Sequence, residues 1–280
     1  MFSEFKNTIG KAVNEELESF HGTGPVTAKS GKKYFVKCGN KSGKYLCEAH
    51  GLMEIHKSGY ILTPEVIAVG EKYIVTSYIE SVETTDDFFT KLGHDLAMMH
   101  KNARSDSYGF YEDNFIGDND QQNTPSNSER TSWCEFYFNK RLLYQYRLAE
   151  VNDYVTDELT KLFINIENRI TGIIGCAPEH PSLLHGDLWS GNYICSLSGN
   201  PYIIDPAVYY GHREAELAMT KMFGGFSNSF YRSYDETYPL AEGWEYREDI
   251  YKLYHVLNHL NLFGKSYYPQ ALSILRKYNR

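Results

Sequence analysis

The 280-residue chain lacks the features expected of a membrane-spanning or nucleic-acid-binding protein. No run of 18 apolar residues occurs, so no segment is predicted to cross a membrane. The opening stretch MFSEFKNTIG is too rich in charge for a signal peptide. Basic residues are also scarce: 28 Lys and Arg face 36 Asp and Glu, for a formal net charge of −8. Because nucleic-acid surfaces are usually basic, neither a nucleic acid nor a membrane is an expected partner.

Cysteine is sparse and shows no metal-binding spacing. The chain has five cysteines and no Cys-x-x-Cys pair, which excludes an evident disulfide framework or zinc site. We therefore expect a reducing compartment, the cytoplasm. Internal repeats and low-complexity tracts are missing as well, which argues against a solenoid.

The pattern of apolar residues predicts an α+β protein of two lobes. Residues 1–80 contain short aromatic and β-branched runs at 33–37, 64–70 and 72–80, typical of strands, with a helix predicted over 44–57. Residues 81–280 show helical periodicity over 84–101, 128–150, 153–174, 213–222, 226–235 and 243–263. We expect a strand-rich first lobe and a larger, mainly helical second lobe, with the boundary near 80–85.

Two further segments carry expectations about local structure. Phe5, Ile9, Val13 and Leu17 recur at helical spacing, so an opening helix is predicted over 3–20. The polar stretch GDNDQQNTPSNSE at 117–129 contains a proline and predicts a loop.

The segment LLHGDLWSGNY, residues 183–193, carries the strongest chemical signal. Asp187 and Asn192 have the spacing Asp-x-x-x-x-Asn of a protein-kinase catalytic loop, where the Asp accepts a hydroxyl proton and the Asn binds magnesium. Asp205 ends the apolar run YIID, and a hairpin turning at 198–200 would bring it beside Asn192. Such oxygen ligands suit Mg²⁺. Each residue alone could be an ordinary turn residue, but the joint spacing favours a phosphoryl-transfer site.

The first lobe supplies matching parts. Lys37 ends the strand YFVK, and Glu48 on the following helix could pair with it and direct its ammonium toward phosphates. Gly22 and Gly24 could cover the phosphates, although an ordinary hairpin turn is the alternative. The backbone of Ser77, Tyr78 and Ile79 could meet an adenine edge. ATP and Mg²⁺ are thus the expected cofactors, and the reference pKa of ~3.9 predicts an ionised Asp187 at neutral pH.

Several of these segments together resemble the fructosamine kinase (ketosamine 3-kinase) family, whose relatives include aminoglycoside and choline kinases. HGDLWSGN at 185–192 resembles its catalytic loop, and IIDPAVYYGHREAELAM at 203–219 resembles its metal-binding strand. Further resemblance lies in YGFYEDNFIGDNDQQN, YFVK, EAHGL and LYHVLNHLNLFG, so that it extends from about residue 20 to 270.

The resemblance implies a bilobal protein-kinase-like fold with ATP between the lobes. It implies phosphorylation of a sugar hydroxyl on a ketosamine, a small glycated amine, with Asp187 as proton acceptor. Trp189, Tyr209 and His212 fall in segments expected to line the sugar side, with core packing as the alternative for Trp189 and Tyr209. Glu216 stands where the family usually has Asp, behind the catalytic loop.

Other functions stay open at this point. The acceptor could be an aminoglycoside or a choline-like amine, or the protein could bind nucleotide without catalysis. An intact set of Lys37, Asp187, Asn192 and Asp205 argues against the last alternative. A protein-serine kinase is disfavoured because no D-F-G to A-P-E activation segment is evident. Oligomeric state is not predicted.

Overall fold

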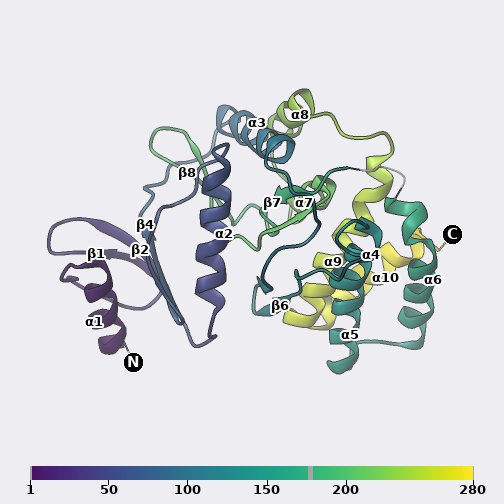
Figure 1. Ribbon diagram of the computed structural model, residues 1–280, viewed down its shortest axis with the longest axis horizontal. Coiled ribbons are helices and arrows are strands. Elements are labelled where there is room, and N and C mark those ends of the chain that lie inside the picture. Colours follow the sequence, from purple (N-terminus) through teal and green to yellow (C-terminus); the bar gives the residue numbers. More distant parts are fainter. Residues whose placement is uncertain (1, 176–178, 280) are drawn as a thin grey trace.

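A computed structural model describes residues 2–175 and 179–279 of the chain. The strands of a four-stranded sheet gather toward the N-terminus, and most helices lie toward the C-terminus, with one long helix, α2, between the two parts (Figure 1). This arrangement confirms the predicted mixed α+β, two-lobed fold. Among the described residues, no helix is long and apolar enough to cross a membrane.

The N-terminal sheet is antiparallel throughout, in the order β1-β2-β4-β3. Its strands are β1 (Gly24–Thr27), β2 (Lys33–Cys38), β3 (Val66–Gly70) and β4 (Tyr73–Ser77). Alternation along β2 buries Tyr34 and Val36 in a small core shared with helix α1 (Phe2–Val13). Lys37 is on the other face of the strand, because successive side chains of a strand point in opposite directions.

Helix α2 (Lys44–Ser58) connects the sheet to the second part of the molecule. It packs on the sheet through Ala49 and Leu52, and Ile55 joins the large C-terminal core. Gly51 is a helix-weakening residue, but it has a packing role here. A Cβ atom at this position would lie 3.1 Å from the ring of Pro206. The glycine thus lets α2, with Glu48 on it, approach the segment that follows Asp205.

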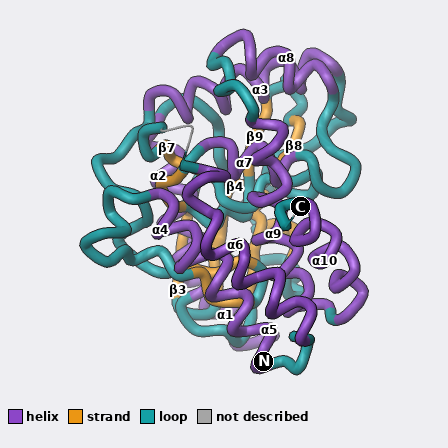
Figure 2. Tube along the Cα trace, turned by 90° about the vertical axis from the view of Figure 1, so that its right-hand side faces the viewer, coloured by secondary structure: helices purple, strands orange, loops and turns teal. Residues whose placement is uncertain are grey.

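The C-terminal part is built from helices around one extensive apolar core. Figure 2 shows several of these helices in front of the strands. They are α3 (Asp86–Asn102), α4 (Trp133–Tyr137), the π-helical turn Phe138–Leu143, α5 (Tyr144–Val151), α6 (Asp157–Ile174), α7 (Arg213–Thr220), α8 (Asn228–Thr237), α9 (Trp244–Phe263), the short 3-10 turn Lys265–Tyr267 and α10 (Tyr268–Lys277). The Thr85 and Thr156 hydroxyls cap α3 and α6, which fixes where these helices begin.

The described part of the chain also forms three two-stranded ribbons. They are β5 (Asn114–Ile116) with β6 (Asn119–Gln121), β7 (Ser182–Leu184) with β10 (Tyr209–Gly211), and β8 (Tyr193–Cys195) with β9 (Pro201–Ile203). The last pair is the predicted hairpin, with Tyr193 opposite Ile203.

Two local predictions were wrong. The opening helix ends at Val13 instead of residue 20, because Asn14 takes a left-handed conformation and Leu17 then pairs with Ala28 beside the sheet. The segment 117–129 is not all loop: β6 lies within it, and Gln121 is buried. Its amide donates to Asn114 and to the carbonyl of Ala207, so buried partners replace the water that its polarity suggested. The domain boundary near residue 80 stays a proposal.

Candidate active site

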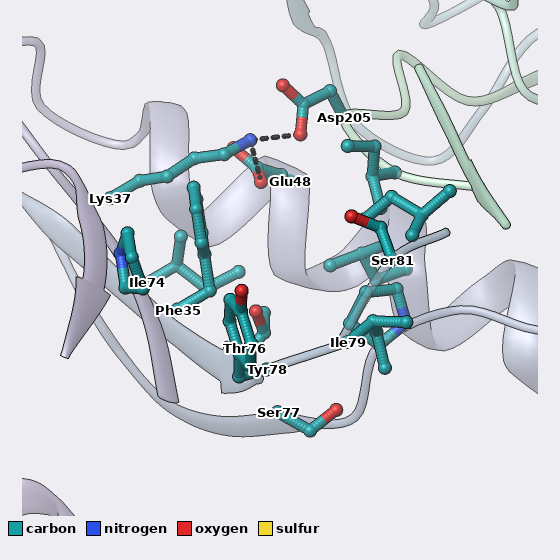
Figure 3. Close-up of a pocket in the computed structure, with 15 residues that line it drawn as sticks. Phe35, Lys37, Glu48, Ile74, Thr76, Ser77, Tyr78, Ile79, Ser81 and Asp205 are labelled. Atoms are coloured by element: carbon teal, nitrogen blue, oxygen red, sulfur yellow. Dashed lines mark hydrogen bonds and ion pairs between the residues drawn. The ribbon is translucent and has the colours of Figure 1, made fainter. Parts of the chain in front are cut away.

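Lys37 lies at the junction of the two parts and contacts carboxylates from both. Its Nζ donates to Glu48 Oε1 of α2 at 2.7 Å and to the Asp205 carboxylate from the C-terminal part (Figure 3). Burial alone would lower the pKa of Lys37, but the charges of Glu48 and Asp205 outweigh it and raise that pKa. Lys37 is therefore a fixed cation at this junction, as the sequence predicted.

A first cavity of about 320 Å³ opens on the sheet side of Lys37. Apolar side chains such as Phe35 and Ile74 line much of it (Figure 3). Ile204 lines it as well. Ser77, the last residue of β4, lines its edge as well, together with Tyr78 and Ile79, which follow β4 toward the second part. A largely apolar cavity bordered by a connecting segment is suited to a flat heterocycle.

A second cavity of about 410 Å³ lies on the other side of the same ion-pair cluster. Lys37, Glu48 and Asp205 line both cavities, so the two adjoin. Asp187, Trp189 and Asn192 also line the second cavity, which is the more polar of the two. The residues predicted from the Asp-x-x-x-x-Asn spacing and from the strand YFVK therefore converge on one cleft.

The backbone of residues 185–187 is held by contacts with Ala207 and Glu216. Gly186 has φ +86°, and a Cβ atom there would lie 2.0 Å from the carbonyl oxygen of Ala207. The buried Glu216 carboxylate accepts hydrogen bonds from the backbone N–H groups of His185 and Gly186. Glu216 thus supports the loop from behind despite its extra methylene compared with Asp.

The environment of Asp187 differs from the sequence expectation. Enclosure in the cavity floor raises the pKa of Asp187 to about 8, even though the Asn192 amide, which donates to its carboxylate at 3.2 Å, acts in the opposite direction. The reference pKa applies to a solvated carboxylate, and this one is largely desolvated. A cation bound close to Asp187 would favour the ionised form of its carboxylate.

Asn192 and Asp205 lie side by side, as the hairpin predicted. The Asn192 carbonyl accepts a hydrogen bond from Ile204 N–H at 3.0 Å, directly before Asp205. The Asn192 side-chain nitrogen donates to Asp187, so its amide oxygen is the atom suited to a cation. Asp205 has φ +59°, an uncommon conformation for a non-glycine residue that is typical of functional sites.

This donor set fits magnesium better than a transition metal. Across residues 2–175 and 179–279, no group of three or more His, Cys, Asp or Glu side chains could hold a metal ion. One carboxylate and one amide oxygen cannot form a complete protein cage. Mg²⁺, however, is commonly held by one or two protein oxygens together with water and substrate phosphates.

Gly22 and Gly24 were predicted to cover the phosphates, but the structure brings their neighbours to the cavities instead of the glycines themselves. Gly22 precedes β1 and Gly24 is its first residue, so neither forms the turn between β1 and β2. Their neighbours Thr23 and Pro25 line the second and first cavities, respectively. The Thr23 hydroxyl and Cys38 backbone hydrogen-bond, which ties the segment to the strand that carries Lys37.

Two residues predicted to line the sugar side lie in the core instead. Tyr209 is buried against the Arg141 guanidinium, 4.0 Å from its ring centroid. His212 stacks on Trp133, with ring centroids 4.7 Å apart, and burial lowers its pKa to about 3. Both follow Asp205 closely in sequence, but their side chains, on β10 and at the start of α7, are buried.

Sequence reasoning also missed residues that line the second cavity. Lys44 and Tyr45 begin α2, and Asn114, Phe115 and Gly117 come from the β5–β6 ribbon. The resemblance block at 108–123 covers the ribbon, but nothing in its composition distinguishes cavity residues from loop residues. That the ribbon lies beside Ala207 at the cavity depends on the tertiary fold, which the local sequence does not reveal.

The two-part fold and the Lys–Glu–Asp cluster at its junction place the protein among the protein-kinase-like phosphotransferases. A candidate fructosamine-3-kinase from Thermobifida fusca superimposes with a TM-score of 0.89, at 29% identity over 98% of each chain. The streptomycin–ATP complex of APH(2")-IIa shares the fold with a TM-score of 0.65, at 14% identity over 99% of this chain and 96% of the other.

The chain belongs to the fructosamine kinase family, whose model matches residues 6–280. A chloroplastic protein-ribulosamine 3-kinase from Oryza sativa subsp. japonica is 40% identical over 98% of this chain and 82% of its own length. A probable ketoamine kinase from Vibrio parahaemolyticus is 36% identical over 88% of this chain and 85% of its own. The protein is thus an enzyme of the phosphotransferase class.

Proposed function

We propose that the enzyme transfers the γ-phosphoryl group of ATP to a sugar hydroxyl of a ketosamine. The observation that carries this proposal is the convergence of Lys37, Asp205 and Asp187 on adjoining cavities, one apolar and one polar. Phosphoryl transfer needs a positioned hydroxyl, neutralised phosphate charge and a proton acceptor, and this cleft holds residues suited to each task.

The apolar cavity suits the adenine of the nucleotide. The Ser77 N–H is bonded to the Glu65 carbonyl, so Tyr78 and Ile79 at the edge would offer the backbone hydrogen-bond groups to the base, and Phe35 and Ile74 would offer apolar contact. Phosphates would extend from there toward Lys37, whose charge is kept by its two carboxylate partners. The ATP named for the APH(2")-IIa complex supports nucleotide use in this fold.

Asn192 and Asp205 would hold Mg²⁺ through the amide oxygen and the carboxylate. Bound there, the ion would offset phosphate charge at the reacting group and favour the ionised form of Asp187. The Lys37–Asp205 contact would loosen as the nucleotide phosphates become the partners of the ammonium.

The polar cavity would hold the acceptor sugar. Asp187 lies in its floor, where it can orient a hydroxyl. The hydroxyl oxygen bonds to the γ-phosphorus, the bond to the bridging oxygen of ADP breaks, and the hydroxyl proton passes to Asp187. The names of the related ketoamine and protein-ribulosamine kinases favour a ketosamine over an aminoglycoside or choline-like amine. We keep a cytoplasmic location as a prediction from the cysteine content.

The test is ATP consumption with a panel of ribulosamines, fructosamines, aminoglycosides and choline, with the phosphorylated position determined by NMR. We expect magnesium-dependent turnover with ketosamines and phosphate on a sugar oxygen. Turnover restricted to aminoglycosides or choline would replace the proposed acceptor. ATP binding without turnover on any alcohol would favour a nucleotide-binding regulator.

A further inference from the structure

A chain of aromatic rings leads away from the acceptor cavity across the surface. It starts at Trp189, which lines the cavity, and its next ring is Phe223, with ring centroids 5.6 Å apart. Phe223 contacts His259 at 5.2 Å, and His259 contacts both Phe263 and Tyr267, at 5.4 and 5.1 Å. We refer to Phe223, His259, Phe263 and Tyr267 as the aromatic strip.

Two of the four residues in the aromatic strip are well exposed to solvent. Phe223 is 46% and Phe263 65% solvent-exposed, although both are large apolar side chains. Connected apolar surface of this kind, next to a cavity, marks a contact site more often than scattered single residues do. Burial lowers the pKa of His259, which keeps this ring neutral at physiological pH.

The backbone at Phe223 adds an independent observation. Phe223 has φ +55°, which is unusual for a bulky residue, and Gly224 and Gly225 continue in left-handed conformations. A glycine at position 223 would adopt this conformation at lower cost. The chain instead keeps a phenylalanine whose ring stands between Trp189 and His259, which indicates that the ring itself has a role.

The strip is also fixed to the acceptor cavity through α9. Asn119 of the β5–β6 ribbon donates to Asn258 of α9 at 2.8 Å. Gly117, which lines the cavity, lies so close to α9 that a Cβ atom would be 2.9 Å from Leu262. The end of α9 that carries His259 and Phe263 is therefore held beside the cavity.

We propose that the aromatic strip binds the carrier of the ketosamine, a polypeptide segment around a glycated lysine, while the sugar occupies the cavity. This proposal rests on the proposed function. A ketosamine consists of a sugar, the amine joined to it and whatever carries that amine, so the carrier must leave the cavity. The lysine methylenes and the neighbouring residues of the segment can pack on an uncharged aromatic surface. An extended segment spans roughly 3.3 Å of this surface per residue. The "protein-ribulosamine" in the name of the rice relative is consistent with a polypeptide carrier.

The experiment compares kcat/KM for two acceptors: a ketosamine of a small amine, and the same sugar on a lysine within a peptide. The variants are Phe263→Ala, the ring-conserving Phe263→Tyr, and Phe223→Asn, which suits a left-handed backbone. Tyr111→Ala is the matched control, because Tyr111 is 67% exposed and contacts His50 and Phe110, outside the strip.

We expect Phe263→Ala and Phe223→Asn to lower the peptide-to-small-amine ratio of kcat/KM about tenfold, through KM of the peptide. Phe263→Tyr and Tyr111→Ala should keep the wild-type ratio. An unchanged ratio in both strip variants would overturn the proposal, and so would equal losses on both acceptors. A dimer that dissociates on Phe263→Ala while the ratio stays constant would assign the strip to a second copy of the chain. Wild-type protein inactive on both ketosamines would refute the proposed function itself, and the strip proposal with it.

Discussion

Lys37 and Asp205, which are 168 residues apart in sequence, form an ion pair that joins the sheet to the segment directly after the β8–β9 hairpin. Glu48 holds the other side of the same ammonium. Asp205 thus has two tasks in the proposed reaction: it partners Lys37 in the free protein and would hold Mg²⁺ with Asn192 in the loaded one. This dual role makes the Asp205 carboxylate the natural probe of metal use.

Replacing Asp205 should separate metal-dependent from metal-independent nucleotide binding. We expect Asp205→Ala to weaken Mg-ATP binding at least tenfold, because one of two protein metal ligands is lost. Metal-free ATP should bind no more weakly, since a carboxylate near the phosphates has been removed. Calorimetry with and without Mg²⁺ measures both affinities. Unchanged Mg-ATP affinity would contradict the role of Asp205 as a metal ligand.

Gly186 should be irreplaceable for a reason that goes beyond its backbone angle. Gly186 and Gly199 have similar positive φ values, +86° and +77°, but only Gly186 faces a backbone oxygen, while nothing lies within 4 Å of a Cβ atom at Gly199. Gly199→Ala should therefore cost only the left-handed penalty, about 1 kcal/mol of unfolding free energy. Gly186→Ala should cost clearly more and displace the catalytic loop.

Urea unfolding of both glycine variants, together with turnover, tests this difference. We expect Gly199→Ala to retain near-wild-type turnover and Gly186→Ala to lose most of it. Equal unfolding free energies for the two variants would show that the contact with Ala207 does not constrain the loop.

Buried histidines should make the protein less stable in mild acid. Burial lowers the pKa of His212 and of His255 to about 3 each, with nearby positive charge adding to the effect. Above about pH 6.5 both histidines are neutral in the folded and unfolded chains, and no stability is lost. As pH falls below that value the unfolded chain binds protons that the folded chain does not, so stability decreases.

Each of these histidines should remove about 2 kcal/mol of unfolding free energy between pH 6.5 and 5. Urea unfolding across this range gives the slope, and His255→Leu should reduce it. His255 is chosen because its Nδ1 has no hydrogen-bond partner among the described residues, so the substitution breaks no bond there. A slope unaffected by His255→Leu would show that His255 is protonated in the folded protein.

The sequence predicted which residues gather at the cleft better than it predicted their surroundings. Asp187, Asn192 and Asp205 were identifiable because their spacing is dictated by one loop and one short hairpin, which are local structures. Lys37 and Glu48 were identifiable from strand alternation and the helix that follows. That these five residues meet at one cleft depends on the tertiary fold. The family resemblance implied that fold, so their meeting could be expected as well.

The failures have a common physical cause. Tyr209 and His212 were expected at the sugar because they neighbour the metal-binding strand, yet sequence proximity does not fix the direction of a side chain. Gln121 was expected in a solvated loop, although its amide is satisfied by buried partners from distant segments. The pKa of Asp187 was predicted from a solvated reference, and desolvation depends on packing that no local pattern encodes.

Asp187→Asn tests the central claim most directly, because the substitution keeps the size of the side chain and the Asn192 hydrogen bond to the backbone carbonyl at position 187. Turnover with a ketosamine and Mg-ATP affinity should be measured on the same preparation. We predict that turnover falls by a factor of about 10² to 10⁴ while Mg-ATP affinity stays within about threefold of the wild type. Turnover equal to that of the wild type would contradict the assignment of Asp187 as the proton acceptor.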